Sequence, residues 1–230
     1  MLKAIIFDCD GVIVNSEPHH LNAFRKVLSE EDIPLTDEEY YAHYLAMDDK
    51  GCFETVLSRY HRPATKDVVK RLILRKMALY RILSQEELIL YPGVVEFVKN
   101  VGGKYRLAIA SGAFRSEIKF ALDKGGLRSA FPVIVSAQDV RNGKPHPESY
   151  LTALSRLNAL PPSISPISPS EVVVIEDSIH GIEAAHAAGM KCLAVTTSYP
   201  REALVTLADR VVPSLLEVMP EDLEGLCALS

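Results

Sequence analysis

The amino-acid sequence predicts an α/β fold in which a parallel sheet carries an inserted all-helical domain. Short apolar runs typical of buried strands recur along most of the chain, and helical patterns separate them. One long stretch near the N-terminus contains helical patterns alone. Apolar strands that alternate with amphipathic helices are typical of parallel sheets that are covered on both faces.

Five apolar runs are expected to form the sheet. The first, residues 3–8, is rich in β-branched side chains and is followed by an Asp-Gly turn signal. Four more runs follow after residue 93, and each is separated from the next by a helical pattern; they cover residues 106–110, 133–135, 172–175 and 192–195.

Residues 15–88, between the first and second runs, are expected to hold four helices and no strand. A helix begins near Pro18, a capping box opens the second at Thr36, an apolar stripe marks the third around Phe53, and Thr65 caps a fourth that runs to about residue 83. We therefore expect a core domain from residues 1–14 and 90–230, and a helical cap domain from residues 15–89.

Composition excludes several classes of function. The 230 residues carry a net charge of −5 without a basic cluster, so neither nucleic acid nor an anionic membrane is an expected partner. No apolar run reaches 18 residues, and the N-terminus does not resemble a signal peptide. The four widely spaced cysteines predict reduced thiols and a cytoplasmic location, and the Pro/Ser-rich segment 158–171 predicts an extended surface loop.

Two aspartates follow the first expected strand. Because side chains alternate along an extended chain, Asp8 and Asp10 project to the same side, a few ångströms apart. Carboxylates that close repel each other unless a cation or a shared proton lies between them. Aspartate is also common in turns, so this motif alone leaves an ordinary turn open.

Polar residues also follow the next three expected strands. Ser111-Gly112 suits either an anion site or a helix N-cap, and Lys144, held between Gly and Pro, suits either phosphate neutralisation or a solvated loop. The acidic pair Glu176-Asp177 suits a hard divalent cation. Ligands of open α/β sheets bind at the carboxyl ends of strands, so together the four motifs predict one site.

This series of motifs resembles the haloacid dehalogenase superfamily of phosphotransferases. The match is the DxDG of residues 8–11, the serine at 111, the GKPxP lysine at 144 and the acidic pair at 176–177, and it covers essentially the whole chain. It implies a Rossmann-like core. The helical insertion is similar to the small cap of the branch that contains β-phosphoglucomutase and many sugar-phosphate phosphatases. Residues 15–20 resemble its DSEPxH segment, with Asn15 where Asp is usual.

The resemblance implies a role for each core residue. Asp8 would be the nucleophile that forms an aspartyl-phosphate, and Asp10 would be the general acid and base. Mg²⁺ would be held by Asp8, the backbone carbonyl of Asp10 and Asp177, with Glu176 touching the ion or one of its ligands. The transferring phosphoryl oxygens would be bound by the remaining motif residues, which are Ser111, Gly112 and Lys144.

In this branch the cap selects the substrate. The candidates are His20, the loop 46–51 and Lys76, although His20 is equally explained by packing or a bond to Asp10, and Lys76 by a solvated position on a basic helix. Asp49 stands where the mutase has a phosphate-gripping arginine, and Lys50 beside it compensates if the loop shifts by one residue.

The predicted activity is Mg²⁺-dependent hydrolysis of a small phosphomonoester, a sugar phosphate, by a monomeric enzyme. The alternatives are a β-phosphoglucomutase-type transferase and, less favoured, a non-catalytic binding relative. A relative of the last kind would be expected to lack the nucleophile or the metal-binding acids, and this sequence has them all.

Overall fold

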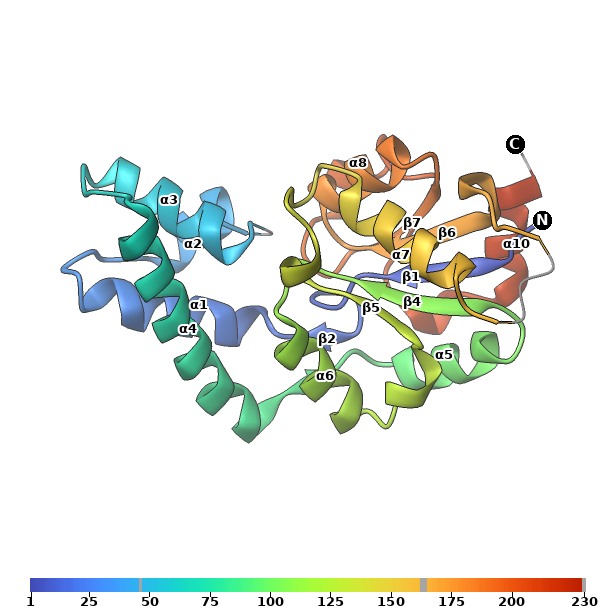
Figure 1. Cartoon of the computed structure of the whole chain (residues 1–230), viewed down its shortest axis with the longest axis horizontal. Helices are drawn as coiled ribbons and strands as arrows, with labels where there is room; N and C mark the ends of the chain where they lie inside the picture. The colour runs from blue at the N-terminus through green and yellow to red at the C-terminus, as the bar shows by residue number, and fades with distance from the viewer. Residues whose placement is uncertain (46, 162–164, 229–230) are drawn as a thin grey trace. The chain divides into compact units, whose positions relative to one another are not determined.

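The computed structural model describes residues 1–45, 47–161 and 165–228 and divides into two compact units (Figure 1). One unit joins Met1–Asn15 to Leu90–Ser230, and the other is Ser16–Ile89. We refer to them as the core unit and the cap unit. Their boundaries differ from the predicted domain boundaries at Asn15 alone.

The core unit is built on a six-stranded sheet in which every neighbouring pair of strands is parallel. The order across the sheet is β5-β4-β1-β6-β7-β8. The strands are β1 (Ala4–Phe7), β4 (Arg106–Ala110), β5 (Val133–Val135), β6 (Val172–Glu176), β7 (Lys191–Val195) and β8 (Arg210–Val212). The predicted α/β class is confirmed, and the edge strand β8 was not predicted.

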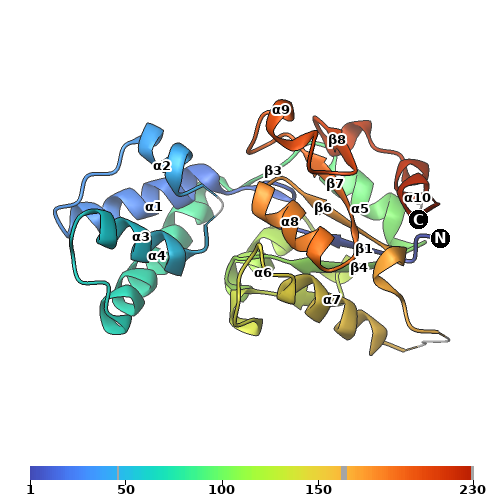
Figure 2. The same ribbon diagram turned by 90° about the horizontal axis from the view of Figure 1, so that it is seen from above.

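Helices cover both faces of the sheet (Figure 2). Ile6 faces the layer of α7 (Glu148–Asn158) and α8 (Ile179–Ala187), with which it shares one hydrophobic cluster. Phe7 points to the opposite face, where its ring meets Phe97 of α5 (Val94–Gly102) at 6.1 Å between centroids. The remaining helices of the core unit are α6 (Arg115–Lys124), α9 (Arg201–Leu204) and α10 (Pro220–Ala228).

The cap unit consists of four helices around its own apolar cluster, which includes Phe24, Phe53 and Leu72. The helices are α1 (Glu17–Ser29), α2 (Asp37–His43), α3 (Asp49–Arg59) and α4 (Lys66–Glu87). Two predicted N-caps are confirmed, because the Thr36 side chain accepts from the backbone of α2 and the Thr65 side chain from that of α4. The fourth helix extends beyond its predicted end near residue 83.

Short elements connect these parts. β2 (Val14–Asn15) pairs with β3 (Ile89–Leu90), so the expectation of no strand from residue 15 onward is wrong at Asn15. Single 3-10 turns lie at η1 (Arg128–Ala130), η2 (Ala137–Asp139), η3 (Pro169–Glu171) and η4 (Leu215–Glu217). The segment 158–171, predicted as an extended loop, contains one turn of helix, η3. Its residues 162–164 lie outside the described residues. Of the helices that the structure describes, none has the length and apolarity to span a membrane.

A partly buried carboxylate anchors the turn after β5. Asp139 accepts from the backbone and hydroxyl of Ser136, and it pairs with Arg115 at 2.6 Å and Arg156 at 2.8 Å. Burial alone would raise the pKa of Asp139, but the Ser136 and arginine donors outweigh it and hold this pKa well below its ordinary value of 3.8.

We expect Asp139→Asn to lower the free energy of unfolding by about 1.5–3 kcal/mol at pH 7, because charge-assisted hydrogen bonds are lost. A lowered pKa stabilises the fold in full above the pKa of the unfolded chain, and this contribution is lost as the pH falls toward the pKa of the folded state. The difference between wild type and variant should therefore shrink as the pH falls below about 4. Urea unfolding at pH 7 and pH 3 measures both effects, and an equal difference at the two pH values would contradict the electrostatic explanation.

Candidate active site

The predicted core residues lie at the carboxyl ends of four neighbouring strands. Asp8 follows β1, Ser111 follows β4, Lys144 lies in the loop after β5, and Glu176 is the last residue of β6. These strands stand side by side in the order β5-β4-β1-β6. Since parallel strands end at the same edge of a sheet, the four side chains come together there.

A buried lysine bridges two carboxylates in this cluster. Lys144 Nζ donates to Asp8 Oδ1 and to Glu176 Oε1, both at 2.6 Å, and its side chain is only 13% exposed. Burial would lower the pKa of Lys144, but the two carboxylates raise it above its ordinary value. The side chain is therefore an ammonium cation at neutral pH.

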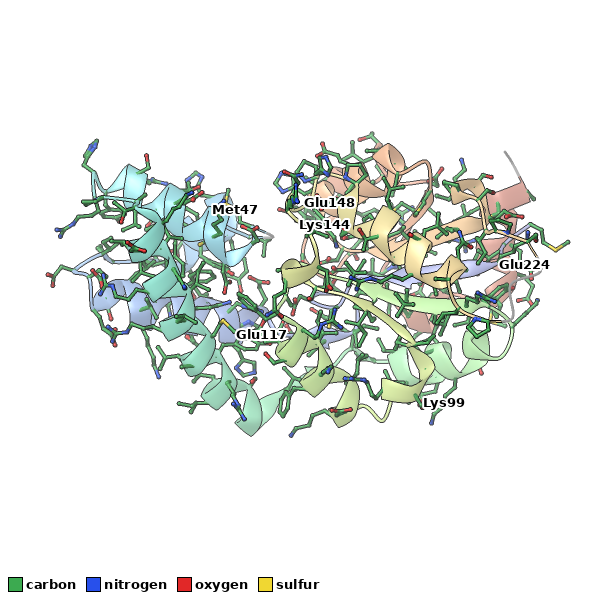
Figure 3. The ribbon with its side chains drawn as sticks, viewed as in Figure 1. Met47, Lys99, Glu117, Lys144, Glu148 and Glu224 are labelled. Atoms are coloured by element: carbon green, nitrogen blue, oxygen red, sulfur yellow. The ribbon has the colours of Figure 1, made fainter. Side chains whose placement is uncertain are left out.

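The loop that carries Lys144 is held by the first residue of α7. The Glu148 carboxylate accepts from the backbone N–H of Arg141 at 2.9 Å and of Asn142 at 3.0 Å. Lys144 and Glu148 lie next to each other where this loop enters the helix (Figure 3). The loop is thus held at residues 141–142 by the Glu148 carboxylate and at Lys144 by its two ion pairs.

Glu176 is fully buried, and hydrogen-bond donors surround both of its oxygens. Oε1 accepts from Lys144 and from the Tyr150 hydroxyl at 2.7 Å, and Oε2 accepts from the backbone N–H groups of Asp177 and Ser178 and from the Ser178 hydroxyl. Burial would raise the pKa of Glu176, but Lys144 and the other donors lower it. Glu176 is thus an ionised group that holds the lysine and the turn after β6.

A glycine makes room for this carboxylate. A Cβ at position 181 would lie 1.8 Å from Glu176 Oε1, so Gly181 of α8 admits the carboxylate to its place. Gly11 does the same for Asp177, since a Cβ there would lie 1.9 Å from Oδ2, and its φ of +77° also favours glycine.

Negative charge exceeds positive charge around Asp8. Burial raises the pKa of Asp8 to about 8, with Glu176 and Asp10 adding to the rise and Lys144 opposing it. Burial, Glu176 and Asp8 also raise the pKa of Asp177, whose carboxylate accepts from the Ser198 hydroxyl. Such a site favours a bound cation or a proton. Among the described residues, no three His, Cys, Asp or Glu side chains already form a metal-binding cluster.

Ser111 connects the second strand end to the first. Its hydroxyl lies 3.5 Å from Asp10 Oδ2 and accepts from the backbone N–H of Ala113 at 3.0 Å. Gly112 is exposed, and a Cβ there would meet nothing within 4 Å.

Three of the predicted cap residues meet inside the cap unit. Lys76 Nζ lies 2.6 Å from Asp49 Oδ1 and 2.5 Å from His20 Nδ1, and the ring centroid of Phe24 is 4.7 Å away. The side chain of Lys76 has no exposed surface, so the alternative of a solvated lysine is wrong. The ring of His20 stacks on Tyr80.

The predicted cap loop contributes little else to this cluster. Lys50 is 68% exposed and lies 3.9 Å from Glu54, and Asp48 accepts from Gly51 as the N-cap of α3. Ala46 lies outside the described residues. Of the predicted cap residues, Lys76, Asp49 and His20 are thus the ones that lie together.

Tyr150, Ser178 and Ser198 belong to the core cluster but were not among the predicted site residues. Tyr150 follows the apolar periodicity of α7, a pattern typical of an ordinary core residue. Ser198 follows β7 in the polar run of residues 196–198, which matches none of the predicted motifs. The signal that the sequence offers for these residues is their position after a strand.

Comparison with known proteins identifies the family. The family model "Haloacid dehalogenase-like hydrolase" matches residues 5–195. The chain is similar to the phosphorylated carbohydrates phosphatase of Thermotoga maritima, with 32% identity over 194 residues, which cover 83% of each chain.

Two solved structures share the fold. CbbY of Rhodobacter sphaeroides in complex with phosphate is 25% identical, with a TM-score of 0.84 over 97% of this chain and 100% of the other. β-Phosphoglucomutase of Clostridium difficile is 23% identical, with a TM-score of 0.86 over 100% of this chain and 98% of the other. The chain belongs to the haloacid dehalogenase-like hydrolases.

Proposed function

We propose that the chain is a phosphatase that hydrolyses a small phosphomonoester, a sugar phosphate. The observation that carries this proposal is the Lys144 ammonium held between Asp8 and Glu176 where the central strands end. In this arrangement Asp8, the proposed nucleophile, lies next to a fixed cation that would neutralise phosphoryl oxygens. The name of the Thermotoga maritima relative supports the substrate class.

The reaction has two steps on this chain. An oxygen of Asp8 attacks phosphorus, the bond to the leaving oxygen breaks, and Asp10 donates a proton to that oxygen. Asp10 then takes a proton from a water that attacks the aspartyl-phosphate, which releases inorganic phosphate and restores Asp8. Lys144, Ser111 and the backbone at Gly112 bind the phosphoryl oxygens during both steps.

The donor set at Asp8 fits Mg²⁺. The pKa values of Asp8 and Asp177 are raised by burial and by neighbouring carboxylates, so the negative charge in this place exceeds what Lys144 neutralises. Asp8, the carbonyl of Asp10 and Asp177 would supply the oxygen ligands that Mg²⁺ prefers. Glu176 would act through Lys144, because donors already surround both of its oxygens. A bound Mg²⁺ would offset the charge of the substrate phosphate.

The test is phosphate release from p-nitrophenyl phosphate, followed by a screen of sugar phosphates, polyol phosphates, phosphoglycolate and nucleotides. We expect turnover with Mg²⁺, loss of turnover with a chelator, and recovery when Mg²⁺ is restored. A protein that binds phosphate but turns over no phosphomonoester would support the non-catalytic alternative.

The likeness to β-phosphoglucomutase makes transfer between two positions of one sugar the second candidate. A mutase must also hold a distal phosphate, for which a cap cation is needed. In this cap the Lys76 ammonium is buried and paired with Asp49, whose other oxygen is buried and accepts no hydrogen bond from the described residues. An incoming phosphate dianion near Asp49 would be repelled by roughly 1 kcal/mol or more.

We therefore expect hydrolysis to prevail over transfer. With β-glucose 1-phosphate and a catalytic amount of the 1,6-bisphosphate, free phosphate should form and glucose 6-phosphate should not accumulate. Lys50→Ala is the matched variant, because Lys50 is the exposed cation beside Asp49. Efficient formation of glucose 6-phosphate that is lost in Lys50→Ala would favour the mutase.

A further inference from the structure

A tyrosine outside the strand-end motifs lies against the buried cation of the site. Tyr150 is on the first turn of α7 and is fully buried. Its hydroxyl donates to Glu176 Oε1 at 2.7 Å, and its ring centroid lies 4.9 Å from Lys144 Nζ. Tyr150 therefore contacts both partners of one ion pair.

The two donors share a single acceptor atom. Glu176 Oε1 receives the Tyr150 hydroxyl and the Lys144 ammonium, while the same ammonium also donates to Asp8. Without the hydroxyl, the full charge of Oε1 would face Lys144 and draw the ammonium away from Asp8. The ring face of Tyr150 adds an attraction that depends on the ammonium staying over it.

From this geometry we propose that Tyr150 is a positioning residue that sets how Lys144 is shared between Glu176 and Asp8. This inference rests on the proposed function, since the position matters because Lys144 binds the phosphoryl oxygens beside the nucleophile. Tyr150 acts through Lys144 and touches neither the substrate nor the reacting atoms.

A second tyrosine of the chain, Tyr105, serves as the control for a hydrogen bond that affects stability alone. Tyr105 is also buried, and its hydroxyl donates to Glu224 at 2.5 Å. It precedes β4, at the amino ends of the strands, and Glu224 lies at the other end of the core unit from Lys144 (Figure 3). Tyr105→Phe removes the same kind of hydrogen bond far from the site.

The experiment compares Tyr150→Phe with Tyr105→Phe. Melting temperature, kcat, KM and the Kd of inorganic phosphate in the presence of Mg²⁺ are measured, and rates are divided by the folded fraction from circular dichroism. Both variants should melt a few degrees lower. Only Tyr150→Phe should lower kcat, by about tenfold, and weaken phosphate binding, since a misplacement of about 1 Å costs up to a hundredfold.

A double-mutant cycle tests whether Tyr150 acts through the lysine. In a Lys144→Met background, Tyr150→Phe should weaken phosphate binding no further, because the group that it positions is gone. The proposal is overturned if Tyr150→Phe keeps wild-type kcat and phosphate affinity, or if its effect is undiminished without Lys144. A wild type that binds phosphate without turnover would refute the phosphatase and leave the binding cycle as the test of Tyr150.

Discussion

Asp8→Asn should reduce turnover to below about 1% of wild type while the core remains folded. An amide oxygen is too weak a nucleophile to form the phosphoryl intermediate. Folding should survive, because burial raises the pKa of Asp8 and makes its ionised form costly in the metal-free core. Lys144 keeps its second partner, Glu176, in the variant. Steady-state phosphate release and circular dichroism measure the two effects.

Two further variants serve as comparisons for Asp8→Asn. Asp10→Asn should be nearly as damaging, because general acid catalysis is worth roughly 10²–10⁴-fold. Asp139→Asn makes the same chemical change at a carboxylate that only anchors a turn, so it should lower stability and leave kcat per folded molecule unchanged. If Asp8→Asn kept more than a few per cent of activity, Asp8 would not be the nucleophile.

Asp177→Ala should raise the Mg²⁺ concentration needed for half-maximal activity at least about tenfold, or abolish activity at any concentration. The reason is that the proposed site has few protein ligands, and this change removes one of them. Measurements are a Mg²⁺ titration of activity and, independently of turnover, the rise in melting temperature that Mg²⁺ causes.

The exposed carboxylate Asp123 of α6 provides the control, because Asp123→Ala removes the same charge outside the cluster. Ser198→Ala should shift the Mg²⁺ titration in the same direction as Asp177→Ala but by less, since it removes only the hydroxyl that donates to Asp177. Identical Mg²⁺ dependence in wild type and Asp177→Ala would contradict the proposed ligand set.

The sheet could be predicted where its strands are buried on both faces. β1, β4 and β6 are continuous apolar runs because helices cover both of their sides. β2 and β3 have only two residues each, and β8 adds two apolar residues to Arg210, whereas the equally short β5 is apolar throughout and was predicted. The C-terminal end of α4 and the single 3-10 turns depend on tertiary contacts that no local pattern encodes.

The convergence of Asp8, Ser111, Lys144 and Glu176 follows from one rule, that parallel strands end at the same edge. The direction of each side chain does not follow from that rule. Glu176 and Asp177 are adjacent in sequence, yet the first is held by Lys144 and the second by Ser198. The pairing of Lys76 with Asp49 joins two helices of the cap and was equally out of reach of a local pattern.

The central place of β1 in the sheet has a consequence for folding during synthesis. Residues 4–7 are synthesised well before both of their partner strands, which lie at residues 106–109 and 172–175. At a synthesis rate of about 5–20 residues per second, roughly ten to thirty seconds pass before β6 has been made and can pair with β1. The cap, a continuous segment with its own apolar cluster, is complete well before then. We therefore expect the cap unit to fold first and β1, which precedes it in the chain, to be among the last elements to pair in the sheet.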